Sequence, residues 1–222
     1  ITEAINENPL HPVFLAVHFP VSHTVFDDSH EMFSENFVNF LKAHPQIIVI
    51  SAHFHVAAQL VQNIYQYENG ATHFQTPMVS GGILTEINCD TYAYLHPHEL
   101  SYIEIEDGFV KIFKADIDTG KQIGKPWEID IAGIVNKTAE PLYTAKKLKS
   151  DCVPYFEECD KIILNSVYDT TLIYSYPRGK CKETGALQDD FVYSHRVVIR
   201  EIESGKEVLN NVYISDFYNL NP

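Results

Sequence analysis

The fold is decided by two apolar segments that end in histidine, Pro12-Val13-Phe14-Leu15-Ala16-Val17-His18 and Ile47-Ile48-Val49-Ile50-Ser51-Ala52-His53-Phe54-His55. Each has the length and composition of a buried β-strand. Between them lies an apolar stripe with the period of an amphipathic helix, formed by Phe33, Phe37, Phe40 and Leu41. A strand, a helix and a strand within about fifty residues predict a βαβ unit, with parallel strands and a right-handed crossover.

The ends of the helix are also marked in the sequence. Asp27, Asp28 and Ser29 are N-cap candidates ahead of the apolar stripe, because their side-chain oxygens can accept hydrogen bonds from the first helical N–H groups. His44-Pro45 ends the pattern, since the residue before a proline avoids the helical conformation. We therefore expect the helix to lie between these two sites.

Three histidines are expected to meet at one edge of the sheet. Parallel strands deliver their carboxyl ends to the same edge, which is where open α/β folds bind ligands. His18, His53 and His55 all follow such strand ends. A single histidine after an apolar strand is usually a packed residue, but neutral imidazoles are good ligands for Zn, Mn and Fe. Three histidines at the ends of two successive strands therefore favour the interpretation that this edge forms half of a metal site.

The composition excludes some classes of partner. The chain has 222 residues, 45% of them hydrophobic, which is typical of a folded globular protein. Its formal net charge of -14 argues against nucleic acid as a binding partner, because nucleic-acid binding needs a basic surface. No apolar run reaches the roughly 18 residues of a membrane span. The chain begins at Ile1 rather than Met, so we expect a processed or truncated N-terminus; an extracytoplasmic or secreted location is favoured but stays open.

The sequence after His55 predicts mainly β-strands. Asp107-Gly108 separates two alternating apolar segments and predicts a tight hairpin. We place a domain boundary near Ile131, after which the composition becomes all-β. The expected strands of this last part are residues 161–164, 171–176, 191–201 and 208–217. Four short strands over about ninety residues predict a small β-sandwich of immunoglobulin or fibronectin type.

The remaining metal and cysteine signals are weaker. No Cys-x-x-Cys occurs, and Cys152, Cys159, Cys181 and His195 are poorly spaced for zinc. A disulfide within the C-terminal region and free thiols both stay open. His73 is expected near the metal-binding edge on a following strand, although nothing in the sequence gives its direction.

These residues resemble a known family. The segments 12–20 and 47–55 look like the C-terminal half of calcineurin-like metallophosphoesterases, whose later motifs are a His, commonly followed by a residue and Pro, and a Gly-His-x-His. The resemblance implies an αββα sandwich that holds two divalent transition metals, Mn, Fe or Zn, and cleaves phosphate esters. It also implies that His18 and His53 bind one ion and that His55 binds its neighbour.

Two departures from the family pattern bear on activity. Ala52 stands where the family has Gly, so the backbone before His53 is less able to adopt a left-handed bend. The family's Asp-x-His, Gly-Asp and Gly-Asn-His motifs do not precede His18. The chain therefore offers three neutral ligands and no carboxylate to bridge two ions. We expect no catalytic residue in this chain and no activity from it alone.

Together these patterns predict an α+β protein. Residues 1–131 are expected to form a partial αββα sandwich, the C-terminal half of a metallophosphoesterase domain, and residues 132–222 a small all-β sandwich. Two functions stay open. The chain is either part of a dinuclear phosphoesterase, with a phosphate-ester small molecule as substrate and the N-terminal half of the same protein as partner, or a non-catalytic binding module that retains the fold.

Overall fold

The structure is a mixed α and β protein in which sheets predominate and helices are few. It divides into two compact units, Ile1–Ser150 and Asp151–Pro222, and each is described by itself. Our predicted boundary lay near Ile131, earlier in the chain than this division. This computed structural model describes residues 1–25, 32–56, 58, 60–79, 82–87, 91–95, 98–151, 153–168, 171–177, 179–180 and 194–214.

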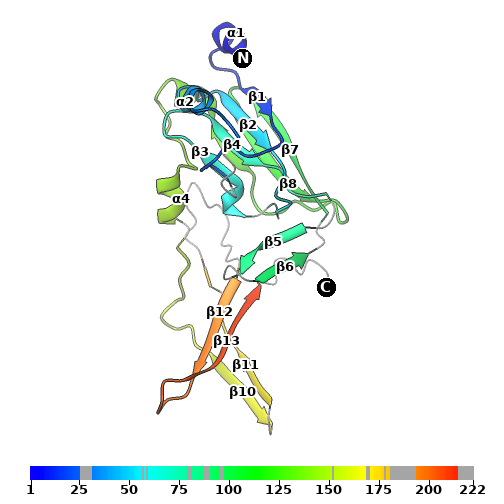
Figure 1. The fold of residues 1–222 in the computed structure, drawn as a ribbon, viewed down its shortest axis with the longest axis vertical. Helices are drawn as coiled ribbons and strands as arrows, with labels where there is room; N and C mark the ends of the chain where they lie inside the picture. Colours follow the sequence, from blue (N-terminus) through cyan, green and yellow to red (C-terminus); the bar gives the residue numbers. More distant parts are fainter. Residues whose placement is uncertain are drawn as a thin grey trace. The chain divides into compact units, whose positions relative to one another are not determined.

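A four-stranded sheet organises the first unit (Figure 1). Its order is β1-β2-β4-β3, and the first three strands are parallel while β3 runs antiparallel to β4. The predicted parallel pair is confirmed, because β1 and β2 are aligned from Val13 opposite Ile47 to Ala16 opposite Ile50. The strands are β1 (Val13–Ala16), β2 (Ile47–Ser51), β3 (Ile64–Gln66) and β4 (Thr72–Gln75).

Helix α2 (Glu35–Lys42) makes the crossover between β1 and β2. Its N-cap is Ser34, whose side chain accepts a hydrogen bond from the Phe37 N–H; the expected caps at residues 27–29 lie outside the described residues. Leu41 is 1% exposed and packs in one cluster with Ile47 and Val49 of β2. Burying one such side chain contributes about 2 kcal/mol. The short helix α1 (Thr2–Glu7) adds Ile5 to this cluster.

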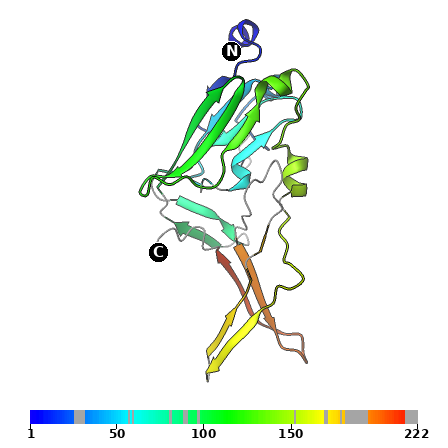
Figure 2. The same cartoon turned by 180° about the vertical axis from the view of Figure 1, so that it is seen from behind.

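A second sheet of the first unit contains the predicted hairpin, and Figure 2 shows it over the four-stranded sheet. Asp107 and Gly108 connect β7 to β8 with positive φ values of 46° and 83°, as a two-residue type I′ turn requires. A Cβ on Gly108 would come within 2.9 Å of the Ala132 Cβ, so only glycine fits there. The strands are β7 (Glu99–Glu106), β8 (Phe109–Asp116) and β9 (Trp127–Asp130).

Two helices correct the prediction that the chain is all-β after Ala132. These are α3 (Ile131–Val135) and α4 (Ala145–Asp151). Each begins at a side chain that caps it. The Asp130 carboxylate accepts a hydrogen bond from the Gly133 N–H at 2.7 Å, and the Thr144 hydroxyl accepts one from the Lys147 N–H at 3.3 Å. Local capping therefore starts helices where apolar periodicity is too short to reveal them.

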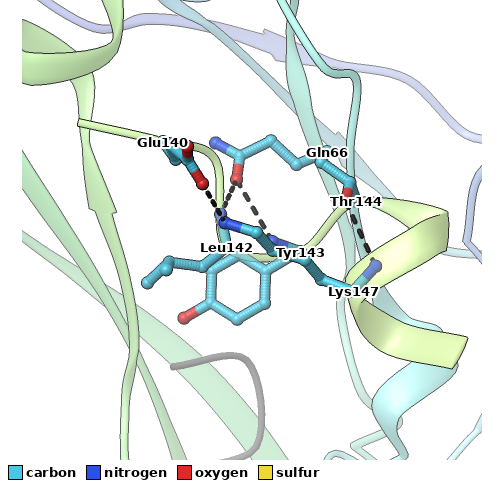
Figure 3. Close-up of polar contacts among 6 residues, drawn as sticks. All are labelled: Gln66, Glu140, Leu142, Tyr143, Thr144 and Lys147. Carbon is cyan, nitrogen blue, oxygen red and sulfur yellow. Dashed lines mark hydrogen bonds and ion pairs between the residues drawn. The ribbon is translucent and has the colours of Figure 1, made fainter. Parts of the chain in front are cut away.

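The segment before α4 is held by Gln66 of β3 (Figure 3). The buried Gln66 Oε1 accepts hydrogen bonds from the Leu142 and Tyr143 N–H groups, at 2.9 and 3.3 Å. Its Nε2 donates to the Thr72 hydroxyl at 2.9 Å, so one amide joins two strands and this segment. An ion pair of 3.1 Å between Lys147 of α4 and Glu140 links the helix to the segment that precedes it.

The smaller elements complete the first unit. The 3₁₀ turn η1 (Val61–Asn63) leads into β3, and β5 (Gly82–Ile87) pairs antiparallel with β6 (Thr91–Leu95). No helix within the described ranges is both long and apolar enough to cross a membrane.

Strands form the second unit as far as it is described. They pair antiparallel as β10 with β11 and β12 with β13. Cys159 is an exposed free thiol, while Cys89, Cys152 and Cys181 lie outside the described residues. The bounds are β10 (Ile163–Tyr168), β11 (Thr171–Ser175), β12 (Ser194–Arg200) and β13 (Glu207–Ile214).

Candidate functional site

Two of the three predicted histidines meet at the carboxyl edge of the parallel strands. The backbone ladder continues beyond the strands, from the Val17 N–H to the Ile50 carbonyl and from the Ala52 N–H to the His18 carbonyl. This pairing brings the next side chains together, and the His53 Nδ1 lies 3.2 Å from the His18 Nε2. Both rings remain accessible to solvent, with His18 the more exposed.

The distance between these nitrogens is compatible with one metal ion. Imidazole nitrogens bind zinc at about 2.0–2.1 Å, so two of them on a tetrahedral ion lie about 3.3 Å apart. The observed 3.2 Å is close to that separation. Without an ion, the same contact is a hydrogen bond in which one ring donates and the other accepts. The pair can therefore serve as two ligands with little rearrangement.

Aromatic neighbours orient the two imidazoles. Phe19 lies 4.8 Å from the His18 ring and 4.3 Å from the His53 ring, measured between ring centroids. Phe54 packs on His53 edge to face at 4.9 Å. These contacts restrict the ring torsions of His18 and His53.

The backbone at this edge is strained at the histidines themselves. His53 has a φ of 82°, and the Phe54 N–H donates to the Ala52 carbonyl at 3.2 Å, which closes a γ-turn around His53. His55 also has a positive φ, 49°. Ala52, where the family pattern has Gly, is not among the described residues with positive φ. The left-handed bends therefore fall on His53 and His55, at a cost on the order of 1–3 kcal/mol each.

The third predicted ligand is not gathered with the other two. His55 is exposed on the loop that follows His53. Among the described residues, no group of three or more His, Cys, Asp and Glu side chains is arranged to hold a metal ion. The site as described is thus a histidine pair with a third histidine two residues away.

His73 lies beneath this edge on β4 and is 1% exposed. Its Nδ1 lies 2.7 Å from the Thr24 hydroxyl and its Nε2 lies 2.8 Å from the Ser51 hydroxyl. The Thr24 hydroxyl donates to the Val21 carbonyl, so it accepts from a protonated Nδ1, and Nε2 then accepts from Ser51. Burial lowers the His73 pKa to about 3. Both nitrogens are occupied, so His73 is not placed as a metal ligand.

Gln75 ends β4 beside Ser51, its partner in the sheet register. Its side chain is fully buried, and neither Nε2 nor Oε1 has a hydrogen-bond partner within the described part of the chain. A buried amide without partners is costly, which makes Gln75 a candidate polar group for a bound molecule or water. Sequence reasoning missed it, because a glutamine at a strand end carries no motif.

Glu99, the first residue of β7, holds the segment that follows His55. Its Oε2 accepts a hydrogen bond from the Ala58 N–H at 2.7 Å, and the residue is 1% exposed. Burial is the main reason that its pKa rises to about 7; Asp116 raises it further, while the Ala58 hydrogen bond and Lys114 lower it. The sequence carries no local signal for this contact between residues 41 positions apart.

Comparisons with other proteins add no assignment to this site. No protein-family model, curated protein or solved structure matches the chain. The likeness to metallophosphoesterases therefore rests on the histidine motifs. Elsewhere on the chain, the exposed His98 Nδ1 lies 2.8 Å from the Asp118 carboxylate.

Proposed function

We propose that this chain is the metal-binding part of a phosphoesterase that hydrolyses a phosphate mono- or diester. The observation that carries the proposal is the 3.2 Å separation of His18 Nε2 and His53 Nδ1 at the carboxyl edge of parallel strands. That edge is the usual ligand-binding side of an α/β sheet. His55, two residues from His53, is the third proposed ligand. In this proposal the first unit is half of an αββα sandwich and the second a small immunoglobulin-like sandwich.

The chain's own residues bind and orient the metal. A divalent Zn, Mn or Fe ion would supply Lewis acidity and a bound water of lowered pKa. His18 and His53 offer neutral nitrogens at a suitable separation, held by Phe19 and Phe54. Three neutral ligands do not bridge two ions, so the proposal assigns the bridging carboxylate and second ion to the N-terminal half of the same protein.

A second candidate function is a non-catalytic binding module that keeps the phosphoesterase fold. It is favoured by the hydrogen bond that His18 and His53 form with each other when no ion is bound. It is also favoured by the lack of a three-ligand group among the described residues. In this case the edge would bind a partner or a single ion without turnover.

Metal analysis of the purified chain tests the proposal. We expect at most one Zn, Mn or Fe per chain, with affinity that falls on acidification because protons compete for imidazole nitrogen. The His18→Ala and His53→Ala variants should lose the ion. The His44→Ala control should keep it, since the His44 Nδ1 lies 2.6 Å from the Phe40 carbonyl at the end of α2.

Turnover separates the two candidates. We expect no hydrolysis of bis-p-nitrophenyl phosphate by this chain alone, and hydrolysis once an N-terminal half with the missing motifs is added. Binding of the ion without turnover in that mixture would favour the non-catalytic module. Unchanged metal content in His53→Ala, or two tightly held ions in the chain alone, would show that the site is elsewhere.

A further inference from the structure

The segments that carry the two paired histidines are joined beneath the site by a continuous hydrogen-bonded chain. It runs from the Ser51 hydroxyl to His73 Nε2, and from His73 Nδ1–H to the Thr24 hydroxyl, which donates to the Val21 carbonyl. Ser51 lies two residues before His53, and Thr24 lies in the loop that follows His18. His73 belongs to neither segment, because it comes from β4.

The strand that leads to His53 is held at both its backbone and its side chain. The Ser51 carbonyl accepts from the Thr76 N–H at 2.8 Å and from the Thr76 hydroxyl at 3.1 Å. The Ser51 hydroxyl donates to His73 at 2.8 Å. With Ser51 fixed in this way, the left-handed turn at His53 begins from a defined position.

The imidazole of His73 suits this role in charge as well as in geometry. Burial keeps it neutral, so it places no positive charge beneath a cation site. A neutral imidazole has one donor and one acceptor, and here the hydroxyl of Thr24 and the hydroxyl of Ser51 satisfy each of them. A lysine, which has three donors and no acceptor, could not match this pair of partners.

We propose that His73 is a positioning residue that holds the His18 and His53 segments at the separation one metal ion requires. This inference rests on the proposed function, because it assigns His73 a role in the same metal site. His73 acts through Ser51 and Thr24 and does not touch the ion.

Removing either hydroxyl should weaken metal binding. We expect Thr24→Val, which keeps the side-chain shape, and Ser51→Ala to raise the Kd for Zn²⁺ by about 10- to 100-fold. The conservative variants Thr24→Ser and Ser51→Thr keep the hydroxyl and should stay within about threefold of the unaltered chain. The Co²⁺-loaded Thr24→Val protein should also show an altered visible absorption spectrum, which a purely structural role at a distance would not produce.

A spectroscopic measurement tests the chain of hydrogen bonds without metal. Long-range ¹H–¹⁵N correlation of the unaltered protein should show His73 as the neutral Nδ1–H tautomer from pH 7 to pH 4. In Thr24→Val the tautomer preference should shift, because Nδ1–H loses its acceptor. An Nε2–H tautomer or a charged ring in the unaltered protein would overturn the inference, even if a variant fails to fold.

The outcomes distinguish the inference from the proposed function. If His18→Ala and His53→Ala abolish Zn²⁺ binding while Thr24→Val and Ser51→Ala do not weaken it, His73 is not a positioning residue and the site stands. If His18→Ala and His53→Ala leave the Kd for Zn²⁺ unchanged, the proposed site is wrong, and the inference falls with it.

Discussion

His53 combines a candidate metal-binding side chain with an unfavourable backbone. Its φ of 82° lies in a region that glycine adopts freely and that other residues enter at a cost, although histidine tolerates it better than most. The γ-turn directs the imidazole at His18 and brings Phe54 against it. Strain of this kind persists where the surrounding structure requires it, and it often marks functional positions.

Glycine at position 53 should therefore be more stabilising than alanine. Both His53→Gly and His53→Ala remove the ring and its aromatic contacts, but only glycine relieves the positive φ. We expect the free energy of unfolding of His53→Gly to exceed that of His53→Ala by about 1 kcal/mol. Urea unfolding followed by the fluorescence of Trp127, the single tryptophan, measures the difference.

The exposed Asn39 of α2 supplies the matched control for this comparison. There the order should reverse, because glycine in a helix is less stable than alanine by about 1 kcal/mol. If alanine were the more stable residue at position 53 as well, the turn at His53 would carry no strain.

At the scale of elements, Glu99 ties β7 to the segment that follows the histidine loop. The Ala58 N–H donates to its carboxyl group at 2.7 Å. The groups that act on it include Asp116, which lies opposite in the hairpin register, and Lys114. Burial holds its pKa at about 7, so the folded protein keeps this proton at a pH where the unfolded chain has lost it.

Burial of the Glu99 carboxyl should make stability fall as the pH rises. Between the unfolded pKa of about 4.5 and the folded value of about 7, the folded state binds more protons, so the free energy of unfolding decreases with pH, by about 3 kcal/mol in total. His73 acts oppositely: its lowered pKa costs stability only as pH falls from 6.5 toward 3. Urea unfolding at pH 5 and pH 8 should show Glu99→Gln gaining stability relative to the unaltered chain at pH 8.

The control for this prediction is Glu104→Gln, a carboxylate that is less buried on the same strand. It should leave the pH dependence unchanged. An identical pH dependence in Glu99→Gln and the unaltered chain would mean that the Glu99 carboxyl is ionised in the folded protein and that burial does not raise its pKa.

Elements whose signals are local could be predicted from the sequence. The parallel strands β1 and β2 with helix α2 between them are predicted by the spacing of apolar residues along the chain. The β7–β8 hairpin is predicted by Asp107-Gly108, because few other residue pairs adopt the backbone conformation of this turn. The short helices α3 and α4 escaped prediction, because a five- or seven-residue helix shows little period. Their caps, Asp130 and Thr144, were the available signals.

Contacts between distant residues could not be predicted in the same way. The sequence placed His18 and His53 at one edge, because the parallel direction of the two strands alone determines which edge their carboxyl ends reach. The 3.2 Å contact between the two rings agrees with that placement. The roles of His73 and Glu99 depend on which face their side chains take and which loop passes over them. Such pairings over long separations in the chain require the folded structure.

At the scale of the whole molecule, the two units differ in how much apolar surface they bury. In unit 1, β2 and β4 are almost wholly buried. Of the buried apolar residues within the described ranges, Val197 alone lies in unit 2. On β10, Ile163, Leu164 and Val167 are each more than half exposed, at 59%, 58% and 61%. Since burial of apolar surface is the main stabilising contribution, the described part of unit 2 has the weaker core.

Unit 2 should therefore open before unit 1. Amide hydrogens of β10 and β11 should exchange with solvent at least tenfold faster than those of β2 and β4, because two-stranded sheets with exposed faces open at low free energy. Hydrogen–deuterium exchange with peptide-resolved mass spectrometry of the full chain measures this. A urea series should show the same order, with protection in β10 and β11 lost before Trp127 fluorescence changes. Equal protection in the two units would show that further burial stabilises β10 and β11 in solution.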